Sequence, residues 1–201
     1  MRIIGGSESG LRLASPKGSG VRPTVDRVRE AIFNRLAADI VGAKVLDLFS
    51  GTGAIGLESA SRGAGSVLSV EKSPRHARII DQNIRQCGYQ RPRIVLKLGC
   101  AFRSIEQLAS LGECFDFIFA DPPFGDKTSG QRSQSMAQRL IDDPNLLSVT
   151  HARSVVVLGH ASRDEIEIAG PWHSLKQQRY GDATIVYLAS TNQKSFIEAP
   201  A

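Results

Sequence analysis

The chain has 201 residues, with 25 Lys and Arg side chains against 20 Asp and Glu, and its formal net charge is +5. This length accommodates one domain with a full hydrophobic core and at most a small appendage, and no apolar run is long enough to cross a membrane. The three cysteines are widely spaced, and neither they nor the four histidines have the spacing of metal ligands. We therefore expect free thiols in a reducing cytoplasm and no metal site.

The positive charge is concentrated near the N-terminus. Residues 1–35 contain seven basic side chains and three acidic ones, a local excess of +4. A basic pole of this kind favours a polyanionic partner, and we expect nucleic acid, with a merely solvated surface as the alternative. The residues expected to hold it are Arg12, Lys17, Arg22, Thr24, Arg27 and Arg29.

Residues 1–23 are not expected to join the main sheet. Two short strand-like runs, at residues 2–4 and 11–13, flank a run of turn-forming residues, which is typical of a β-hairpin. Thr24 is a candidate N-cap for the helix that follows, whose apolar positions include Val28 and Ile32.

From residue 44 onward, strand-like and helix-like segments alternate. Short apolar runs predict strands at residues 45–49, 66–71, 94–98, 115–120 and 154–158. Helical patterns lie between them, up to residue 62, at 74–87, around 102–108 and near 136–141. This alternation is typical of a parallel sheet with helices on both faces. Residues 175–180 and 183–188 then form a hairpin pattern, so we expect the sheet to finish with an antiparallel strand.

The segment 45–58 joins a buried strand to a glycine-rich turn and a helix. Gly51, Gly53 and Gly56 match the dinucleotide fingerprint, and Glu71 follows 20 residues after the first glycine, at the end of the next strand. The glycines let a ligand approach the backbone, and the acid can accept hydrogen bonds from ribose hydroxyls. The pattern predicts a nucleoside-containing cofactor without distinguishing a nicotinamide from S-adenosylmethionine (SAM). The alternative is that the glycines only let a helix pack close to a strand.

Asp47 favours SAM. It lies within the apolar strand, where an unpaired carboxylate is costly. An acid four residues before the first glycine suits a ligand with an ammonium group, such as the methionine half of SAM, and would repel the pyrophosphate of a nicotinamide cofactor. The alternative is that Asp47 only caps the following turn.

A second chemical centre follows the fourth expected strand, at Asp121-Pro122-Pro123-Phe124. Ligand crevices open at the carboxyl ends of parallel strands, so this segment should face the glycine turn. The prolines make a rigid acceptor pair of the Asp121 carboxylate and the Pro122 carbonyl, beside the ring of Phe124. A nucleobase with an exocyclic amine fits this arrangement, because it can stack on the ring and donate to both acceptors. A simple prolyl turn is the alternative.

The same segment resembles the (Asp/Asn)-Pro-Pro-aromatic signature of SAM-dependent amino methyltransferases. Residues 2–6, 22–34 and 47–53 are similar to the bacterial RsmD family, and the resemblance runs from residue 2 to about residue 188. It implies a Rossmann-like class I SAM methyltransferase fold of the α/β class, with a mostly parallel sheet, a final antiparallel strand and a short N-terminal β-hairpin extension. It also implies methyl transfer to N2 of a guanine in small-subunit (16S) ribosomal RNA.

The resemblance implies catalytic roles for Asp121, Pro122 and Phe124. The cofactor-binding positions that it implies are Asp47, Phe49, Gly51, Thr52, Gly53, Glu71, Lys72, Cys100, Ala101 and Asp121. The chain departs from the family at Cys100, where Asp or Asn is usual, and at Gly159, where the fifth strand often ends in an acid.

The expected organisation is an N-terminal extension at 1–23, a methyltransferase domain at 24–189 and a frayed tail at 190–201. The expected protein is a cytoplasmic monomer whose partner is ribosomal RNA or the assembling 30S subunit, with no membrane involved. Three other interpretations are kept: a DNA adenine-N6 or cytosine-N4 methyltransferase with the same proline motif, an NAD-dependent oxidoreductase with the same glycine spacing, and a non-catalytic RNA-binding module.

Overall fold

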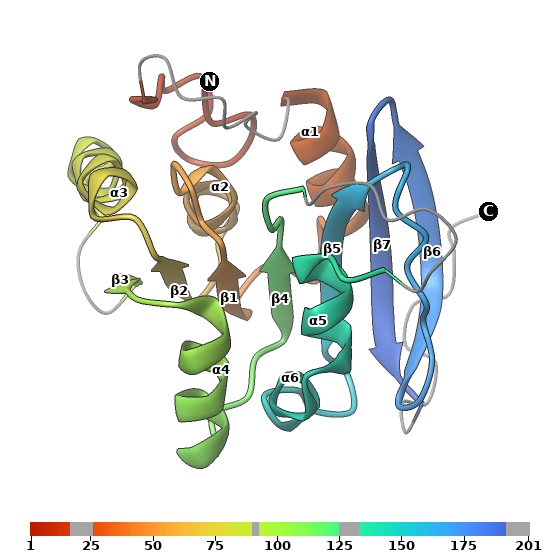
Figure 1. Cartoon of the computed structure of the whole chain (residues 1–201). Coiled ribbons are helices and arrows are strands. Elements are labelled where there is room, and N and C mark those ends of the chain that lie inside the picture. The colour runs from red at the N-terminus through yellow and green to blue at the C-terminus, as the bar shows by residue number, and fades with distance from the viewer. Residues whose placement is uncertain (17–25, 90–92, 125–132, 192–201) are drawn as a thin grey trace.

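The computed structural model describes residues 1–16, 26–89, 93–124 and 133–191. Its centre is a seven-stranded sheet of order β3-β2-β1-β4-β5-β7-β6 (Figure 1). The strands are β1 Lys44–Leu48, β2 Ser66–Glu71, β3 Ile94–Leu98, β4 Phe117–Ala120, β5 Val155–Ala161, β6 Trp172–Tyr180 and β7 Ala183–Ser190. The helices are α1 Asp26–Arg35, α2 Ala54–Ser61, α3 Pro74–Gln86, α4 Ala101–Ser110, α5 Met136–Asp142 and α6 Pro144–Ser148.

The first five strands are parallel, and helices cover both faces of the sheet. Side chains alternate between the two faces: Val45 and Phe117 join one core with α1 and α2, whereas Leu46 and Ile118 join the other with α4, α5 and α6. Burial on both sides is the reason why these strands are continuous apolar runs. No helix among the described residues has the length and apolar character needed to span a membrane.

The last two strands confirm the predicted hairpin. Strand β7 pairs antiparallel with both β5 and β6, so it lies between them in the sheet. Strand β5 is longer than expected and ends at Ala161, because its residues 156–161 all have partners in β7.

The short helix α6 was not expected. Asp143 caps it by accepting a hydrogen bond from the Asn145 N–H at 2.9 Å, and Pro144 takes the first helical position. Both residue types are standard helix-start signals, but a helix of five residues is too short to show apolar periodicity.

The N-terminal residues 1–16 fold back on themselves and pack on the core. An antiparallel bridge joins Arg2 to Arg12, and the Ile3 N–H donates to the Leu11 carbonyl at 2.9 Å. Ile3 and Leu13 are buried in the core on the α1–α2 face. The boundary expected at residue 23 and most of the expected tail lie outside the described residues, so that domain division stays a prediction.

A buried carboxylate on α2 anchors this N-terminal segment. Glu58 has no exposed surface, and it accepts hydrogen bonds from the backbone of Ile4 and Gly5 and from Arg62 Nε, each at 2.8 Å. At the end of the same helix, Ser61 donates to the Gly5 carbonyl at 2.6 Å. The segment is therefore attached to α2 by buried polar contacts as well as by apolar packing.

A second anchor comes from α3. The fully buried Asn83 accepts a hydrogen bond from the Ala14 N–H at 2.8 Å and donates to the Ala14 carbonyl at 3.2 Å. It also donates to the Thr52 carbonyl at 3.0 Å. One amide thus joins the N-terminal segment to the glycine-rich turn after β1.

Glu58→Ala tests the first anchor. Removing the carboxylate leaves Arg62 and two backbone N–H groups without their acceptor, so we expect a loss of about 3–5 kcal/mol in the free energy of unfolding. The matched control is Glu113→Ala, which breaks an exposed ion pair with Lys44 and should cost less than about 1 kcal/mol. Urea denaturation measures both, and equal losses would contradict the anchoring role.

Candidate active site

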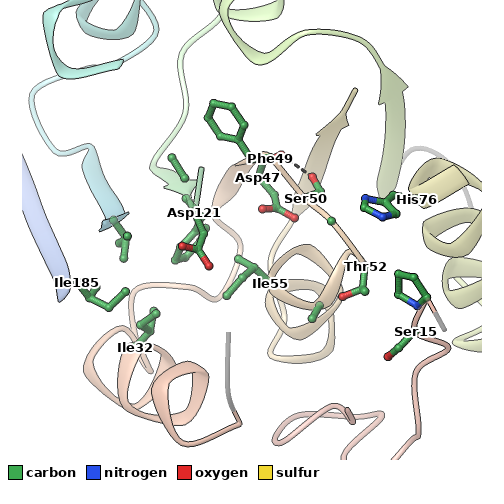
Figure 2. Close-up of a pocket in the computed structure, with 17 residues that line it drawn as sticks. Ser15, Ile32, Asp47, Phe49, Ser50, Thr52, Ile55, His76, Asp121 and Ile185 are labelled. Carbon is green, nitrogen blue, oxygen red and sulfur yellow. Dashed lines mark hydrogen bonds between the residues drawn. The ribbon is translucent and has the colours of Figure 1, made fainter. Parts of the chain in front are cut away.

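A cavity of about 290 Å³ opens at the carboxyl ends of β1 and β4 (Figure 2). These two strands are neighbours, yet the chain leaves β1 toward β2 and leaves β4 toward β5, in opposite directions across the sheet. Such a switch point is where open parallel sheets bind ligands. The lining comes from the N-terminal segment, α1, α2, α3, β1, β4, β5 and β7.

The cavity has a polar half and an apolar half. Asp47, Thr52 and His76 lie in the polar half, and Ile32 and Ile185 lie in the apolar half. Figure 2 shows the Asp121 carboxylate between the two halves. The predicted facing of the glycine turn and the Asp121 segment is therefore what the structure has.

The glycine-rich turn is held by Glu71 at the end of β2. The Gly51 N–H donates to Glu71 Oε2 at 2.8 Å, and the Ser73 N–H donates to Oε1 at 2.7 Å. Gly51 and Gly53 have φ of +59° and +77°, a left-handed conformation that disfavours other residues. Phe49 also has a positive φ, of 59°, which is backbone strain of the kind often found at functional sites.

The third glycine serves close packing. A Cβ at Gly56 would lie 2.6 Å from Ser69 Oγ and 3.2 Å from Asp47 Oδ2, so only glycine lets α2 come this near to the sheet. At this distance the Gly56 N–H donates to the Asp47 carboxylate at 3.2 Å. The alternative interpretation of Asp47 is thus partly correct, because it does accept a hydrogen bond from the first turn of α2.

The Asp47 carboxylate is buried among other acids. The residue is 3% exposed, and burial, together with the nearby charges of Glu71 and Asp121, raises its pKa to about 7. Among the described residues that line the cavity, His76 alone can carry a positive charge. A ligand with a positively charged group would relieve this excess of acid, so the residues present fit a cationic ligand.

The structure brings together only part of the predicted cofactor set. Asp47, Phe49, Gly51, Thr52 and Asp121 line the cavity. The remaining predicted positions do not: Gly53, Glu71, Lys72, Cys100 and Ala101.

The start of α4 nevertheless lies at the same edge of the sheet. The Gly99 N–H donates to the Glu71 carbonyl at 2.9 Å, and the Phe102 ring meets Phe49 edge-on at 6.1 Å between centroids. Cys100 is the N-cap of α4, although its side chain makes no capping hydrogen bond. Lys72 is exposed beyond the cavity. Cofactor roles for these positions stay predictions.

The other two predicted catalytic residues follow Asp121 in the chain and do not line the cavity. Pro122 is buried, and Phe124 is 42% exposed and does not line the cavity. The Phe124 ring is exposed enough for a base to stack on it. The Pro122 carbonyl belongs to the residue next to Asp121 in the chain. Their catalytic roles stay predictions.

The predicted nucleic-acid set needs one correction. Arg29 has no exposed surface, and its guanidinium donates to the Arg2 carbonyl and, at 3.0 Å, to Asp26 Oδ1. It therefore ties α1 to the N-terminal segment and is not placed to bind a phosphate. Arg12 and Arg27 are exposed as expected. Lys17, Arg22 and Thr24 lie outside the described residues.

Several cavity residues were missed in the sequence. Ser15 and Pro16 reach the lining because Asn83 holds the adjoining Ala14, a contact between residues 69 positions apart. His76 lies in the first turn of α3, which Ser73 caps. The isolated Gly159 inside an apolar strand was the one local signal of a close approach.

Comparison with known proteins gives a family match. Residues 1–189 match the family model described as Conserved hypothetical protein 95. The Ribosomal RNA small subunit methyltransferase D of Escherichia coli (strain K12) is 40% identical over 124 residues, which are 62% of this chain and 60% of that protein. The match therefore spans less than two thirds of the length of this curated relative.

Solved structures share the fold. One, "Putative methyltransferase yhhF from Escherichia coli", is 27% identical with a TM-score of 0.76, over 96% of this chain and 99% of that chain. Another is SMU.776, described as "a putative methyltransferase complexed with SAH". It is 17% identical with a TM-score of 0.69, over 85% of this chain and 51% of that chain. The predicted α/β fold with a mostly parallel sheet is thus confirmed.

Asp47→Asn tests the buried acid. The pKa of Asp47 is about 7 in the folded chain, against an ordinary value of 3.8. The unfolded chain therefore loses this proton first as pH rises, and the group destabilises the fold progressively between about pH 4 and pH 7. The Asn variant escapes this penalty, so relative to wild type it should gain up to about 4 kcal/mol between these pH values.

Urea denaturation of the ligand-free protein at pH 4.5 and pH 8 measures this difference. The matched control is Asp81→Asn on the exposed side of α3, whose stability relative to wild type should change little with pH. A constant difference between Asp47→Asn and wild type at both pH values would show that Asp47 is ionised throughout.

Proposed function

Since the chain belongs to the family described as Conserved hypothetical protein 95, the RsmD family, we propose that it transfers a methyl group from SAM to N2 of a guanine in small-subunit ribosomal RNA. The observation that carries this proposal is one cavity shared by the Asp47–glycine turn and Asp121. The name of the Escherichia coli relative supports ribosomal RNA as the substrate class. The partner is free ribosomal RNA or the assembling 30S subunit, met in the cytoplasm by a monomer.

The cofactor site is the polar half of the cavity. SAM supplies a methyl group made electrophilic by its sulfonium, and it carries an ammonium group that suits the acid-rich surroundings of Asp47. Each Glu71 oxygen accepts one backbone N–H, and His76 Nδ1 lies 3.8 Å from Oε1. A carboxylate oxygen has about two lone pairs, so Oε2 keeps one that can accept from a ribose hydroxyl. The adenine ring of SAM would lie past Glu71, next to the start of α4 at Cys100 and Ala101.

Asp121 orients the amine that receives the methyl group. The lone pair of the guanine N2 is delocalised into the ring, so the free amine is a poor nucleophile. The Asp121 carboxylate and the Pro122 carbonyl accept its two N–H groups, and the lone pair then points toward the polar half of the cavity. Positive charge develops on this nitrogen during transfer, where fixed acceptors stabilise it, and the Asp121 carboxylate can take the proton that the methylated amine releases.

The surface near the cavity holds the rest of the RNA. The exposed ring of Phe124 stacks on the base, and the exposed Arg12 and Arg27 bind phosphates without reading sequence. A DNA amino methyltransferase would use the same acceptors, and an oxidoreductase would use the same glycines. Neither activity agrees with the name of the Escherichia coli relative, which is a ribosomal RNA methyltransferase. A methyl-transfer assay distinguishes both activities from the proposed one.

Asp121→Ala should lower the single-turnover rate of methyl transfer to 16S ribosomal RNA or 30S particles by about 10²–10³-fold, about 2.7–4 kcal/mol. The substrate comes from a strain that lacks its own enzyme, SAM is saturating and labelled, and mass spectrometry identifies the methylated nucleoside. Asp121→Asn keeps one acceptor oxygen and should retain more of the rate.

RNA affinity should stay near wild type in both variants, because the lost interaction acts in the transition state. N2-methylguanosine is the expected product. Label in DNA only, NADH binding without SAM binding, or a wild-type rate for Asp121→Ala would each refute the proposal.

Arg12→Ala combined with Arg27→Ala tests the RNA surface. When phosphate contacts are lost, RNA binding releases fewer counterions. The slope of log affinity against log salt concentration should therefore flatten by about one to two units. The matched control is Arg153→Ala. Arg153 is exposed and lies just before β5, at the amino ends of the parallel strands, whereas the cavity opens at their carboxyl ends. Filter binding across a salt series measures the slopes, and equal slopes for all three proteins would place the RNA elsewhere.

A further inference from the structure

Strand β5 contains an unexplained glycine. All seven residues of β5 are buried, and Gly159 lies near its carboxyl end, paired with Ile185 of β7. Glycine weakens a strand interior because it has no side chain to pack and loses more entropy on folding than other residues. Its φ is not in the left-handed region, so the backbone conformation does not require it. The reason lies in what occupies the space beside it.

That space is filled by the Asp121 side chain. A Cβ at Gly159 would lie 2.4 Å from Asp121 Oδ1, closer than real Cβ atoms come to other heavy atoms, and 3.2 Å from its Cγ, which is a tight contact. The register explains this contact, because Ala120 pairs with Leu158 and the next residue of each parallel strand lies alongside the other. Side chains at matched positions of neighbouring strands share a face. Any side chain at position 159 would thus compete with the Asp121 carboxylate.

The same space adjoins the apolar half of the cavity. Gly159 lines the cavity together with Val157 of the same strand, Ile185 of β7 and Ile32 of α1. Figure 2 shows Ile185 and Ile32 on the same side of Asp121. Asp47 lies on the other side of Asp121. Asp121, with its carboxylate beside Gly159, therefore lies between the apolar half of the cavity, which suits a flat base, and the polar half.

We propose that Gly159 is the positioning residue of this site: the space left by its missing side chain holds the Asp121 carboxylate where it meets the amine of a base received in the apolar half of the cavity, which Ile32 and Ile185 line. The inference rests on the proposed methyl transfer and adds to it the side from which the base enters. A methyl group at position 159 displaces the carboxylate by rotation of a flexible side chain, without requiring backbone movement.

The test is a double-mutant cycle with Gly159→Ala and Asp121→Ala in the single-turnover assay. Gly159→Ala should slow methyl transfer by about 10²-fold, the scale for an orienting group moved by about 1 Å. If Gly159 acts only through Asp121, the double variant should be no slower than Asp121→Ala alone. The affinity for S-adenosylhomocysteine (SAH), which is SAM without its methyl group, should stay within about twofold of wild type in isothermal titration. The reason is that the polar half of the cavity is unchanged.

The matched control is Val156→Ala, a change in the same strand whose side chain lies in the core on the opposite face. It should lower the melting temperature without slowing transfer. Crystal structures of wild type and Gly159→Ala should show the Asp121 carboxylate displaced in the variant.

A wild-type rate for Gly159→Ala, additive losses in the double variant, or an unmoved carboxylate would each overturn the role of Gly159 and leave the proposed function standing. If the wild-type protein transfers no methyl group, the proposed function fails. The position of the carboxylate in the two crystal structures then still decides whether residue 159 sets it.

Discussion

The close approach of α2 to β1 is the constraint on which the rest of this structure depends. It exists because Gly56 has no side chain, and it brings a helix N–H to the Asp47 carboxylate inside an apolar strand. The same approach fixes the far end of α2, where Glu58 and Ser61 hold the N-terminal segment by hydrogen bonds. The position of this one helix thus determines both the surroundings of the buried Asp47 carboxylate and the placement of the N-terminal segment that forms one wall of the cavity.

The two acids of the cavity stand on the same face of the sheet for a geometric reason. Side chains alternate along a strand, and Asp47, Asp121 and position 159 all take the side covered by α1 and α2. Since β1, β4 and β5 are adjacent and parallel, their carboxyl ends meet at one edge. Burial of Asp47 and its repulsion by Asp121 therefore act at this edge, and a ligand that brings positive charge would relieve the excess of acid.

Local patterns predicted most of the fold, whereas contacts between distant residues were beyond them. Apolar runs and the spacing of Gly51, Gly53 and Glu71 suffice because strand burial and turn conformation are local properties. The burial of Arg29 depends on a carbonyl 27 positions away. The role of Gly159 depends on the register between β4 and β5, which no local pattern contains. Sequence reasoning thus predicted that the glycine turn and Asp121 face each other, and it missed most of the residues that form the walls of the cavity.

The position of β7 between β5 and β6 ties completion of the cavity to the order of synthesis. Ile185 lies in β7, so one wall of the cavity is made by residues that leave the ribosome long after Asp47 and Asp121. A nascent chain that ends before β7 has both acids but leaves the edge of β5 open. It also exposes unpaired strand groups that invite pairing with another chain. Binding competence and protection from aggregation therefore arrive together, with the last strand.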